Sequence, residues 1–533
     1  MAAGTGAALL VAVWAVARPL WLDEEMIAIN LRDRGIADYL QPLWLGQSAP
    51  FGWLVVQHAI ALVFGTGERA LRFLPVLSGL LTIVTALWVG RRWLTTISSV
   101  VLALLCSCAQ WLTFYFAELK PYAGDAWFGL LLPALGAHAL AARDGREIVR
   151  RAGIFWIVAA IGHWFANGAL LITPGCAAVL MILVFRRCGW RAAWMSSRLA
   201  IVWLVSFGVH YAVAFRHTAS SPFLHGIWAF AFPPVSKGAL ETLRWFGARL
   251  PEFGAKPGSA RVGIALWVIA VAGFAFAGRP RRVLAIMCAT VPLSAIALAV
   301  SGLVPFFERL TLWIVPALYV GVAVFADEAV RLAAARTRHR AIRVTASVAA
   351  LAIVALLTGD IAVTGFKDGL VRYHARQNNR GLDDRAGVRW LAARMQPGDQ
   401  WVTTRYGVVA VWWYAGTDQP ILQVGYQPLG SGCHRDDFAK SLPPASRLLV
   451  YLGFRFDDVA RGFDDLFVNR LSRVGLISGY RPFAMDSYSL IVDRRIASAA
   501  PATLSRLRQK PDTNRPLDGC LEAHVPSVST FLP

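Results

Sequence analysis

Charged residues are scarce in this sequence. Only 16% of its 533 residues are Asp, Glu, Lys or Arg, whereas 56% are hydrophobic, and the mean hydropathy is +0.51. A soluble chain of this length needs more polar surface than that to cover its domains. The composition therefore excludes an ordinary soluble protein and predicts a helical bundle in a membrane that takes up most of the chain.

Acidic residues are the scarcer of the two charged types. The chain has 32 Asp and Glu against 53 Lys and Arg, which gives a formal net charge of +21. On a soluble protein such a charge would indicate binding to nucleic acid. Here the basic residues stand in short clusters between apolar runs, as they do in cytoplasmic loops that face anionic lipid headgroups. We therefore expect membrane lipids as partners and no nucleic acid.

Cysteine is also rare, and its spacing excludes the common metal motifs. None of the seven Cys residues forms a C-x-x-C pair. Cys106 and Cys108 lie in an apolar run, where packing is the expected role. Cys433 and Cys520 lie in the polar C-terminal region, and a disulfide between them stays open if that region is outside the cytoplasm.

Apolar runs account for most of the remaining sequence. The run at 3–21 has no basic residues before it, so we expect a retained span and not a cleaved signal peptide. The runs at 154–167 and 169–185 are short and adjoin, so they could form one broken pair, and the number of spans is eleven plus or minus one. The predicted spans are residues 3–21, 70–90, 97–117, 123–142, 154–167, 169–185, 199–215, 261–277, 283–302, 309–326 and 344–364.

Basic residues in the short loops predict the orientation of these spans. A basic cluster follows each even-numbered span, so all five clusters fall on one side, and the positive-inside rule makes that side cytoplasmic. The other side then receives the first loop at 22–69, the loop at 216–260 and the tail after residue 365. The clusters are Arg91 and Arg92; Arg143, Arg146, Arg150 and Arg151; Arg186, Arg187, Arg191 and Arg198; Arg279, Arg281 and Arg282; and Arg331, Arg336, Arg338, Arg340 and Arg343.

The first loop has structural signals of its own. Residues 23–40 show helical periodicity, and the apolar run at 50–65 is too short to span and fits a helix at the membrane interface.

The tail has the pattern of a small α/β domain. From about residue 384 it alternates between helical and strand patterns. We therefore predict a membrane domain over 1–365, a periplasmic α/β domain over 366–497, and a poorly ordered tail over 498–533, which is rich in Pro, Ser and Arg. The expected helices are 383–395 and 459–475, and the expected strands are 400–406, 420–425, 446–454 and 488–495.

Charged residues adjoin three of the spans on the predicted outer side. Asp23, Glu24 and Glu25 follow the first span, Glu118 and Lys120 follow the third, and Glu308 and Arg309 precede the tenth. Together they would place carboxylates beside fixed cations at one mouth of the bundle. That arrangement suits a reaction in which a lipid-linked phosphate leaves while a carboxylate takes a proton from a hydroxyl. The alternative is that each charge only marks the membrane boundary and extends into the headgroups.

Four segments give the sequence a family resemblance. They are LDEEM at 22–26, the segment from QSAPFGW to LSGLLT at 47–82, YFAELKPYAGD at 115–125 and FERLTLWIVPAL at 307–318. In this order and spacing they resemble the polyprenyl-phosphate-dependent glycosyltransferases of the GT-C fold, which include the protein O-mannosyltransferase (glycosyltransferase 39) family and the aminoarabinose and rhizobial galacturonosyltransferases. The resemblance is good over 15–130, loose over 150–365, and limited to type and position in the C-terminal domain.

The resemblance implies roles for individual residues. Asp23 matches the first-loop Asp that acts as base on the acceptor, and Glu24 matches its acidic neighbour. Lys120, Arg309 and Arg72 are implied to bind the donor phosphate; Lys120 stands where the family often has Arg, and an interfacial anchor is the alternative for Arg72. The implied supporting residues are Glu118, Tyr122, Asp125 and Glu308.

One departure from the family leaves the metal requirement open. Members often carry His-Pro-Pro in the first loop, where this chain has Ser48, Ala49 and Pro50. No cofactor is implied with certainty, and dependence on a divalent metal stays undecided. His58, His163 and His210 are isolated on apolar helices, where packing is the expected role.

The expected activity is that of a membrane glycosyltransferase. It would move a sugar, with inversion, from a polyprenyl-phosphate carrier to a lipid A, core oligosaccharide, glycan or protein acceptor at the outer face of a bacterial inner membrane. A flippase or exporter of a lipid-linked sugar is the alternative, although such transporters usually show paired halves and helices broken at mid-membrane. An O-antigen ligase or polymerase would need a large late periplasmic loop, and a purely structural membrane protein would have no use for the charged motifs.

Overall fold

The computed structural model divides into two compact units, and each is described by itself. The helical unit comprises Met1–Ala17, Gly35–Pro42 and Ser48–His374, and the α/β unit comprises Arg18–Arg34, Leu43–Gln47 and Ala375–Pro533. The structure describes residues 2–279, 281–334, 340–378, 381–416, 420–428, 437–454, 458–484, 487–495 and 519–526.

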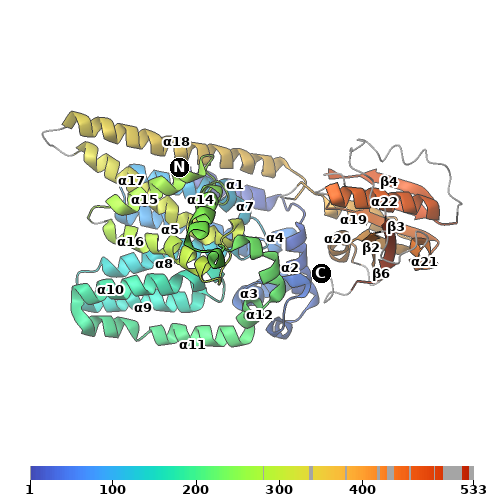
Figure 1. The fold of residues 1–533 in the computed structure, drawn as a ribbon, viewed down its shortest axis with the longest axis horizontal. Helices are drawn as coiled ribbons and strands as arrows, with labels where there is room; N and C mark the ends of the chain where they lie inside the picture. Colours follow the sequence, from blue (N-terminus) through green and yellow to red (C-terminus); the bar gives the residue numbers. More distant parts are fainter. Residues whose placement is uncertain are drawn as a thin grey trace. The chain divides into compact units, whose positions relative to one another are not determined.

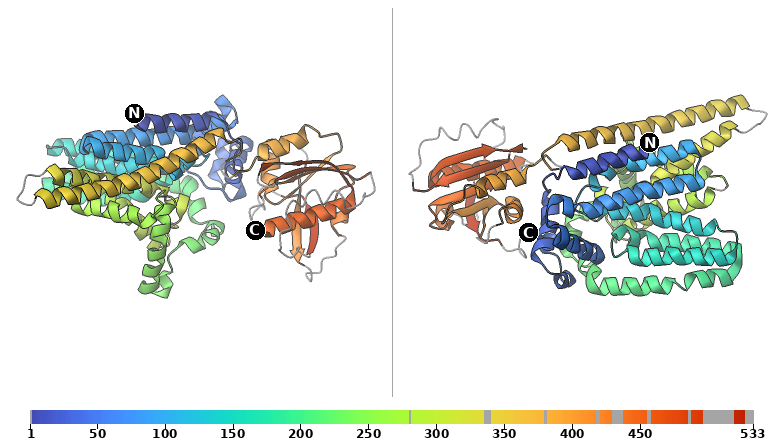
Figure 2. Two further views of the ribbon diagram at one scale, coloured as in Figure 1. Left: turned by 90° about the horizontal axis from the view of Figure 1, so that it is seen from above. Right: turned by 180° about the vertical axis from the view of Figure 1, so that it is seen from behind.

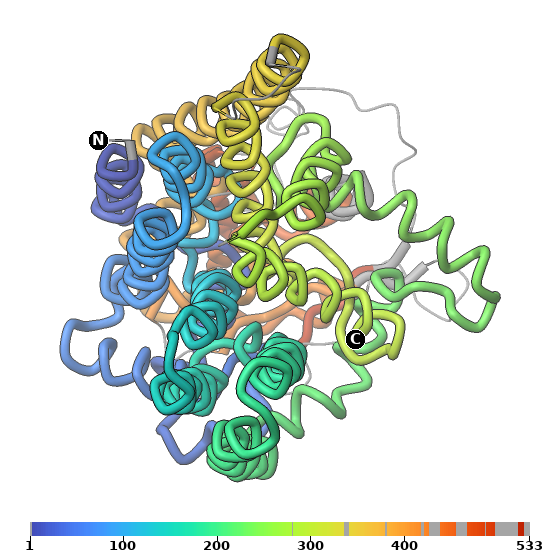
Figure 3. The backbone as a smooth tube through the Cα atoms, turned by 90° about the vertical axis from the view of Figure 1, so that its left-hand side faces the viewer, coloured from blue at the N-terminus to red at the C-terminus, as the bar shows by residue number. Residues whose placement is uncertain are grey.

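The helical unit is a bundle, which Figure 3 views so that many of its helices are seen nearly along their axes. Its helices, most of them labelled in Figure 1, are α1 (Ala2–Ala15), α3 (Phe51–Phe64), α4 (Glu68–Leu71), α5 (Phe73–Trp93), α6 (Thr96–Cys108), α7 (Gln110–Tyr115), α8 (Tyr122–Leu140), α9 (Gly145–Gly162), α10 (Asn167–Ser197), α11 (Ala200–His210), α12 (Arg216–Ala219), α13 (Pro222–Ile227), α14 (Ala239–Ala255), α15 (Gly263–Phe276), α16 (Arg282–Val300), α17 (Val315–Ala334) and α18 (Arg340–His374). A 3-10 helix, η6 (Glu308–Ile314), precedes α17. Helices α1 and α18, from opposite ends of this unit's sequence, lie side by side (Figure 2).

The apolar helices confirm a polytopic helical membrane protein. Among the described residues, five helical stretches are long and apolar enough to cross a bilayer: Phe73–Trp93, Asn167–Ala219, Arg282–Val300, Glu308–Ala334 and Ala341–His374. The predicted spans at 169–185 and 199–215 both lie within the second stretch. Shorter apolar helices cover Ala3–Ala15, Phe51–Phe64, Thr96–Cys108 and Gly263–Phe276.

Glycines allow the helices to approach closely. A Cβ atom on Gly273 of α15 would lie 1.9 Å from the carbonyl oxygen of Gly321 on α17, and one on Gly129 of α8 would lie 2.0 Å from that of Trp313. Small residues at such crossings are the usual basis of helix packing in membranes, where burial of apolar surface does not distinguish a partner helix from lipid. These contacts fix η6 and α17 against the centre of the bundle.

The first group of basic loops meets at the C-terminal end of α8. Arg151 donates to the carbonyl oxygen of His138 at 3.1 Å, and Arg187 donates to that of Leu140 at 2.5 Å. The ring of Trp88, near the end of α5, contacts the His138 ring at a centroid distance of 5.7 Å. The C-terminal ends of α5 and α8, Arg151 in the first half of α9 and Arg187 within α10 therefore lie at one end of the bundle.

The remaining basic loops join the same end. Asp327 of α17 forms an ion pair with Arg281 and accepts the backbone N–H of Thr95, just after α5, at 2.7 Å. Arg331 donates to the carbonyl oxygen of Arg279 at 3.0 Å. All five predicted cytoplasmic clusters are thus represented at one end, as the sequence predicts.

The direction of the helices then fixes the opposite end. Helices α5, α8 and α17 end among the basic loops, so the residues before them, at 72, 120–122 and 308–309, lie at the far end. Helix α18 begins after the last basic loop, so its C-terminus, around His374, also reaches the far end. Helices of 19 to 21 residues are about 30 Å long, which matches the hydrocarbon core of a bilayer.

The α/β unit is a six-stranded sheet with helices on both faces. The strands are β1 (Gln400–Thr404), β2 (Leu422–Pro428), β3 (Arg447–Leu452), β4 (Leu476–Pro482), β5 (Tyr488–Asp493) and β6 (Gly519–His524), in the order β4-β5-β3-β1-β2-β6. Strands β3, β1 and β2 are parallel, and the other pairings are antiparallel. The helices are α2 (Leu22–Asp33), α19 (Asp384–Ala392), α20 (Gly407–Tyr414), α21 (Asp437–Ser441) and α22 (Asp458–Val474).

Each face of this sheet has its own core. Helices α19 and α20 cover one face, where Val388 and Val411 pack with Trp401. Helices α21 and α22 cover the other face, where Phe438 and Phe467 pack with the strand side chains that point to that face.

A small C-terminal domain built on a sheet is confirmed. Four of its elements, α20, α21, β4 and β6, are not among those expected from the sequence. Strand β6 lies within the tail expected to be poorly ordered, so that expectation does not hold for residues 519–524, which pair with β2. Cys433 and the side chain of Cys520 lie outside the described residues, so the disulfide stays a prediction.

The gathering of basic loops predicts the topology of the chain. A green fluorescent protein fused after Arg198 should fluoresce, because it folds in the cytoplasm. Alkaline phosphatase fused after His374 should be active, because its disulfides form only outside the cytoplasm. Each reporter should be inactive when it is fused at the other's position. Phosphatase activity after Arg198 together with fluorescence after His374 would contradict the predicted orientation.

Candidate active site

Helix α2 carries the predicted base and its neighbour. Glu24 is fully buried, and its Oε2 accepts the backbone N–H of Trp21 at 2.9 Å, which closes the first turn of the helix. Asp23 stands in the same turn and keeps part of its surface exposed. A carboxylate at this place is favoured by the unpaired N–H groups of the helix start. The geometry therefore makes Asp23 the carboxylate that a substrate could reach and Glu24 a group that shapes the turn.

The cations lie at the far end of the helical unit. Lys120 and Glu118 stand in the turn between α7 and α8, and Arg72 stands between α4 and α5; all three are buried. Tyr122 is the first residue of α8 and is partly buried. A Lys or Arg in such surroundings is costly unless anions balance it, so buried cations of this kind are typical of sites that hold anionic ligands.

Arg309 comes from the short helix η6. Its guanidinium lies over the ring of Trp228, 5.5 Å from the centroid. Trp228 in turn packs against Phe307 at 5.6 Å. Glu308 stands between Phe307 and Arg309 in the sequence. It has a positive φ of 26°, a conformation that non-glycine residues rarely adopt. The loop at 216–260, through Trp228, and the start of η6 therefore both position the Arg309 side chain.

Asp125 has a structural contact that the sequence does not reveal. Its Oδ1 accepts the backbone N–H of Gly168 at 2.7 Å, and Gly168 lies in the first turn of α10. Helix starts leave such N–H groups without partners inside the helix. Asp125 therefore joins the start of α10 to α8, and this contact accounts for its burial.

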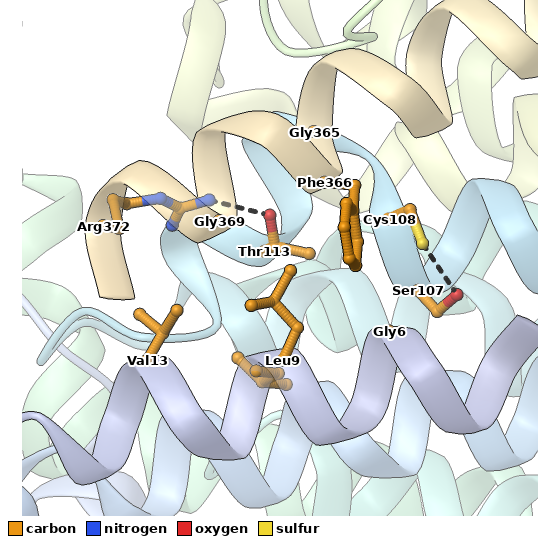
Figure 4. A pocket seen from close by; sticks show the side chains of 11 residues that line it. Gly6, Leu9, Val13, Ser107, Cys108, Thr113, Gly365, Phe366, Gly369 and Arg372 are labelled. Carbon is orange, nitrogen blue, oxygen red and sulfur yellow. Dashed lines mark hydrogen bonds between the residues drawn. The ribbon is translucent and has the colours of Figure 1, made fainter. Parts of the chain in front are cut away.

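Arg372 of α18 belongs to the same end of the bundle. It is 5% exposed, donates to Thr113 Oγ1 at 3.0 Å and pairs with Asp368 at 2.6 Å. Figure 4 shows it on the wall of a narrow pocket between α1, α18 and the α6–α7 segment. Its Nε and Nη1 have no hydrogen-bond partner among the described residues, and Glu118 interacts with it electrostatically.

Arg372 is not among the predicted site residues, because the last predicted span ends at residue 364. The helix continues to His374, and the spacing of Asp368 and Arg372 by four residues is the signal that could have shown this.

Solved structures with a similar fold are known, although sequence comparisons find no relative. No protein-family model and no curated protein matches the sequence. The crystal structure of ArnT from Cupriavidus metallidurans in the apo state matches with a TM-score of 0.52 at 16% identity, over 92% of this chain and 97% of that one. The structure of the same protein bound to undecaprenyl phosphate matches with a TM-score of 0.53 at 17% identity, over 93% and 98%.

This chain has the GT-C fold. The resemblance inferred from the four sequence segments is therefore confirmed for the fold. In this GT-C chain the predicted site residues are divided between the units. Asp23 and Glu24 belong to the α/β unit, whereas the helical unit holds Arg72, Glu118, Lys120, Tyr122, Asp125, Glu308 and Arg309. The meeting of Asp23 with the cations is accordingly part of the proposal below.

The three histidines singled out in the sequence are packed, as expected, although His163 and His210 are not isolated but contact each other. His58 is buried and its Nδ1 lies 2.9 Å from the hydroxyl of Tyr39. His163 and His210 are buried and stacked, with their Nδ1 atoms 3.0 Å apart. Across the part of the chain that the structure describes, no three His, Cys, Asp or Glu side chains are grouped so that they could hold a metal ion.

The contact of Asp125 generates a prediction about stability. Replacing Asp125 by Ala leaves the Gly168 N–H without its acceptor and should lower the free energy of unfolding by about 1–2 kcal/mol. Asp125→Asn keeps an acceptor oxygen and should lose less. Thermal unfolding of the detergent-solubilised protein measures both. Equal melting temperatures for Asp125→Ala and the wild type would contradict the capping role.

Proposed function

We propose that this chain is a membrane glycosyltransferase. It transfers a sugar from a polyprenyl-phosphate carrier to a hydroxyl of an envelope acceptor, outside the cytoplasm of a bacterial cell. The observation that carries the proposal is the set of cations at the end of the bundle opposite the basic loops: Lys120 and Arg72 are buried there, and Arg309 is half-buried. The GT-C fold supports it, because the ArnT structure described above was solved with undecaprenyl phosphate bound.

The donor phosphate is the anion that suits these cations. Lys120 and Arg309 come from different segments, so together they can contact a phosphate from two sides, and Arg72 lies at the same end of the bundle. Arg309 brings a planar fork of donors, and Lys120 brings a compact charge. Glu118 and Glu308 lie beside these cations in sequence, and we assign them to orienting the cations and not to reacting.

The transfer step needs a base and a leaving group. Asp23 takes the proton of the acceptor hydroxyl while the hydroxyl oxygen bonds to the anomeric carbon. The bond from that carbon to the phosphate oxygen breaks, and the electron pair leaves with polyprenyl phosphate. The phosphate gains one negative charge in this step, which Lys120 and Arg309 stabilise. Attack from the face opposite the phosphate inverts the anomeric centre.

The position of the site in the membrane suits a lipid-borne donor. A polyprenyl chain stays in the hydrocarbon layer, so its phosphate reaches the protein at the boundary where helices α5, α8 and α17 begin. We propose that the donor enters sideways from the outer leaflet and that the first loop and the 216–260 loop cover it. We assign the screening of acceptors to the C-terminal α/β domain. The acceptor is a lipid A, core oligosaccharide, other glycan or protein.

The proposed base predicts the effect of one conservative change. Asp23→Asn keeps the size of the side chain and removes the proton acceptor, so the transfer rate should fall by about 10²–10⁴-fold. The amount of protein in the membrane should be unchanged. Glu522→Gln alters an exposed carboxyl on β6 and serves as the matched control. Activity retained in Asp23→Asn would remove Asp23 from this role.

The proposed phosphate site predicts the effect of neutralising a cation. Lys120→Gln and Arg309→Gln should each weaken the binding of undecaprenyl phosphate at least tenfold, because each removes one charge-assisted contact. Arg92→Gln, at the basic end of the bundle, should not change it. Native mass spectrometry of the purified protein with added undecaprenyl phosphate measures the three affinities. A loss in Arg92→Gln equal to that in Lys120→Gln would place the phosphate elsewhere.

The sugar and the acceptor are identified by one comparison. Mass spectrometry of envelope lipids and glycans from cells with and without this protein should show one sugar missing from one acceptor class. The same loss should appear in cells that carry Asp23→Asn. A flippase would instead be indicated if cells without the protein accumulate the lipid-linked sugar on the cytoplasmic side, and if supplying that sugar on the outer side restores the modified acceptor.

A further inference from the structure

Helix α2 belongs to the α/β unit, although the part of that unit that forms the sheet begins only at Ala375. Arg32 donates to the carbonyl oxygens of Trp412 and Trp413, both at 3.1 Å, at the end of α20. The backbone N–H of Leu20 donates to the Tyr414 hydroxyl at 2.8 Å. The two ends of the 18–34 segment are therefore each bound to α20.

The place where α2 binds is the switch point of the sheet. Strand β1 is followed through α20 by β2 on one side, whereas β3 lies on the other side of β1. In open α/β sheets, ligands bind beyond the carboxyl ends of the strands at such a reversal. Phe454, directly after β3, contacts Trp21 at a ring distance of 5.1 Å and Tyr406, just after β1, at 4.5 Å. The segment that begins α2 therefore occupies the crevice that a ligand takes in related sheets.

A buried carboxyl of α2 lies at this crevice. Glu25 is 1% exposed, and neither of its oxygens has a hydrogen-bond partner among the described residues. It interacts electrostatically with Asp384, at the start of α19, and with Tyr451 of β3. The Tyr451 hydroxyl donates to Asp384 Oδ1. A carboxyl in such surroundings is tolerated when it is neutral and destabilising when it is charged.

We propose that Glu25, Asp384 and Tyr451 are positioning residues, which hold α2 in the crevice of the α/β unit and thereby fix the place of Asp23. This inference rests on the proposed function for its effect on catalysis, but the contact itself does not depend on it. Because Asp23 is two residues before Glu25 on the same helix, any release of α2 displaces the proposed base.

Protonation of the pair should control this contact. Burial raises the pKa of Asp384 to about 7, and burial followed by repulsion from Asp384 raises the pKa of Glu25. An acid with a raised pKa in the folded state stabilises the fold fully only below its unfolded value, near 4, and this contribution is lost as the pH rises towards 7 and above. The charged or titratable groups at this place also include Asp23 and Glu24 on α2, Asp383 and Arg385 at the start of α19, Tyr406 after β1, and Tyr414 and Arg32 at the contact with α20.

Two amide variants and one hydroxyl variant test the proposal. Glu25→Gln and Asp384→Asn imitate the protonated acids, so each should keep at least half of the wild-type kcat at pH 6.5. Between pH 6.5 and 9 the wild-type kcat should fall about tenfold as the pair ionises, and each variant should fall markedly less. KM should change little. Tyr451→Phe removes the bond to Asp384 and should lower kcat already at pH 6.5. Glu522→Gln is the control and should follow the wild-type profile.

A second measurement does not depend on transferase activity. Hydrogen exchange of the full-length protein in detergent, corrected for the intrinsic effect of pH, reports the protection of the α2 amides. Protection should fall from pH 6.5 to 8.5 in the wild type and persist in Asp384→Asn. Identical kcat profiles and identical α2 protection in the wild type and both amide variants would overturn the proposal. Full activity in Asp23→Asn with pH-dependent α2 protection would overturn the proposed function alone.

Discussion

The structure depends on the cost of holding charge inside an apolar bundle. Moving an ionised side chain out of water costs several kcal/mol unless other charges or hydrogen bonds replace the water. Lys120, Arg72 and Arg372 are nevertheless buried at the end of a membrane bundle. Each therefore needs nearby anions or hydrogen-bond acceptors, as Arg372 has in Asp368 and Thr113, and the proposed donor phosphate would be one more such anion.

The two ends of the bundle use charge differently. At the basic end, cations donate to carbonyl oxygens at helix C-termini, as Arg187 does to Leu140, and extend towards anionic headgroups. At the other end, the cations are buried next to the starts of helices, where carboxylates also stand. The first arrangement is the one that predicts the orientation in the membrane, and the second is the one on which the proposed donor site rests.

The α/β unit adds a constraint on the base. Its sheet holds α2 at the crevice between β1 and β3, so the helix that carries Asp23 is part of a folded domain and not a free loop. A catalytic group held by a rigid element keeps its position with less loss of entropy during the reaction. Under the proposal above, the same contact would make the position of Asp23 depend on the protonation of Glu25 and Asp384.

The sequence predicts the bundle well because lipid imposes a simple rule on length and hydrophobicity. It also predicts the shared side of the basic loops, since their charges cannot cross the membrane. It does not predict contacts between distant segments: the bond from Gly168 to Asp125 and the pairing of β6 with β2 have no local signal. Strand β4 contains Gly479 and Pro482, which disfavour strands locally, and its pairing with β5 outweighs that preference.

A structure determined with undecaprenyl phosphate bound tests the central claim most directly. The account predicts that the phosphate lies within hydrogen-bond distance of Lys120 and Arg309, with the Asp23 carboxylate facing the side of the phosphate where the sugar would be attached. A phosphate bound at the Arg-rich end of the bundle, or Asp23 turned away from an occupied site, would contradict it.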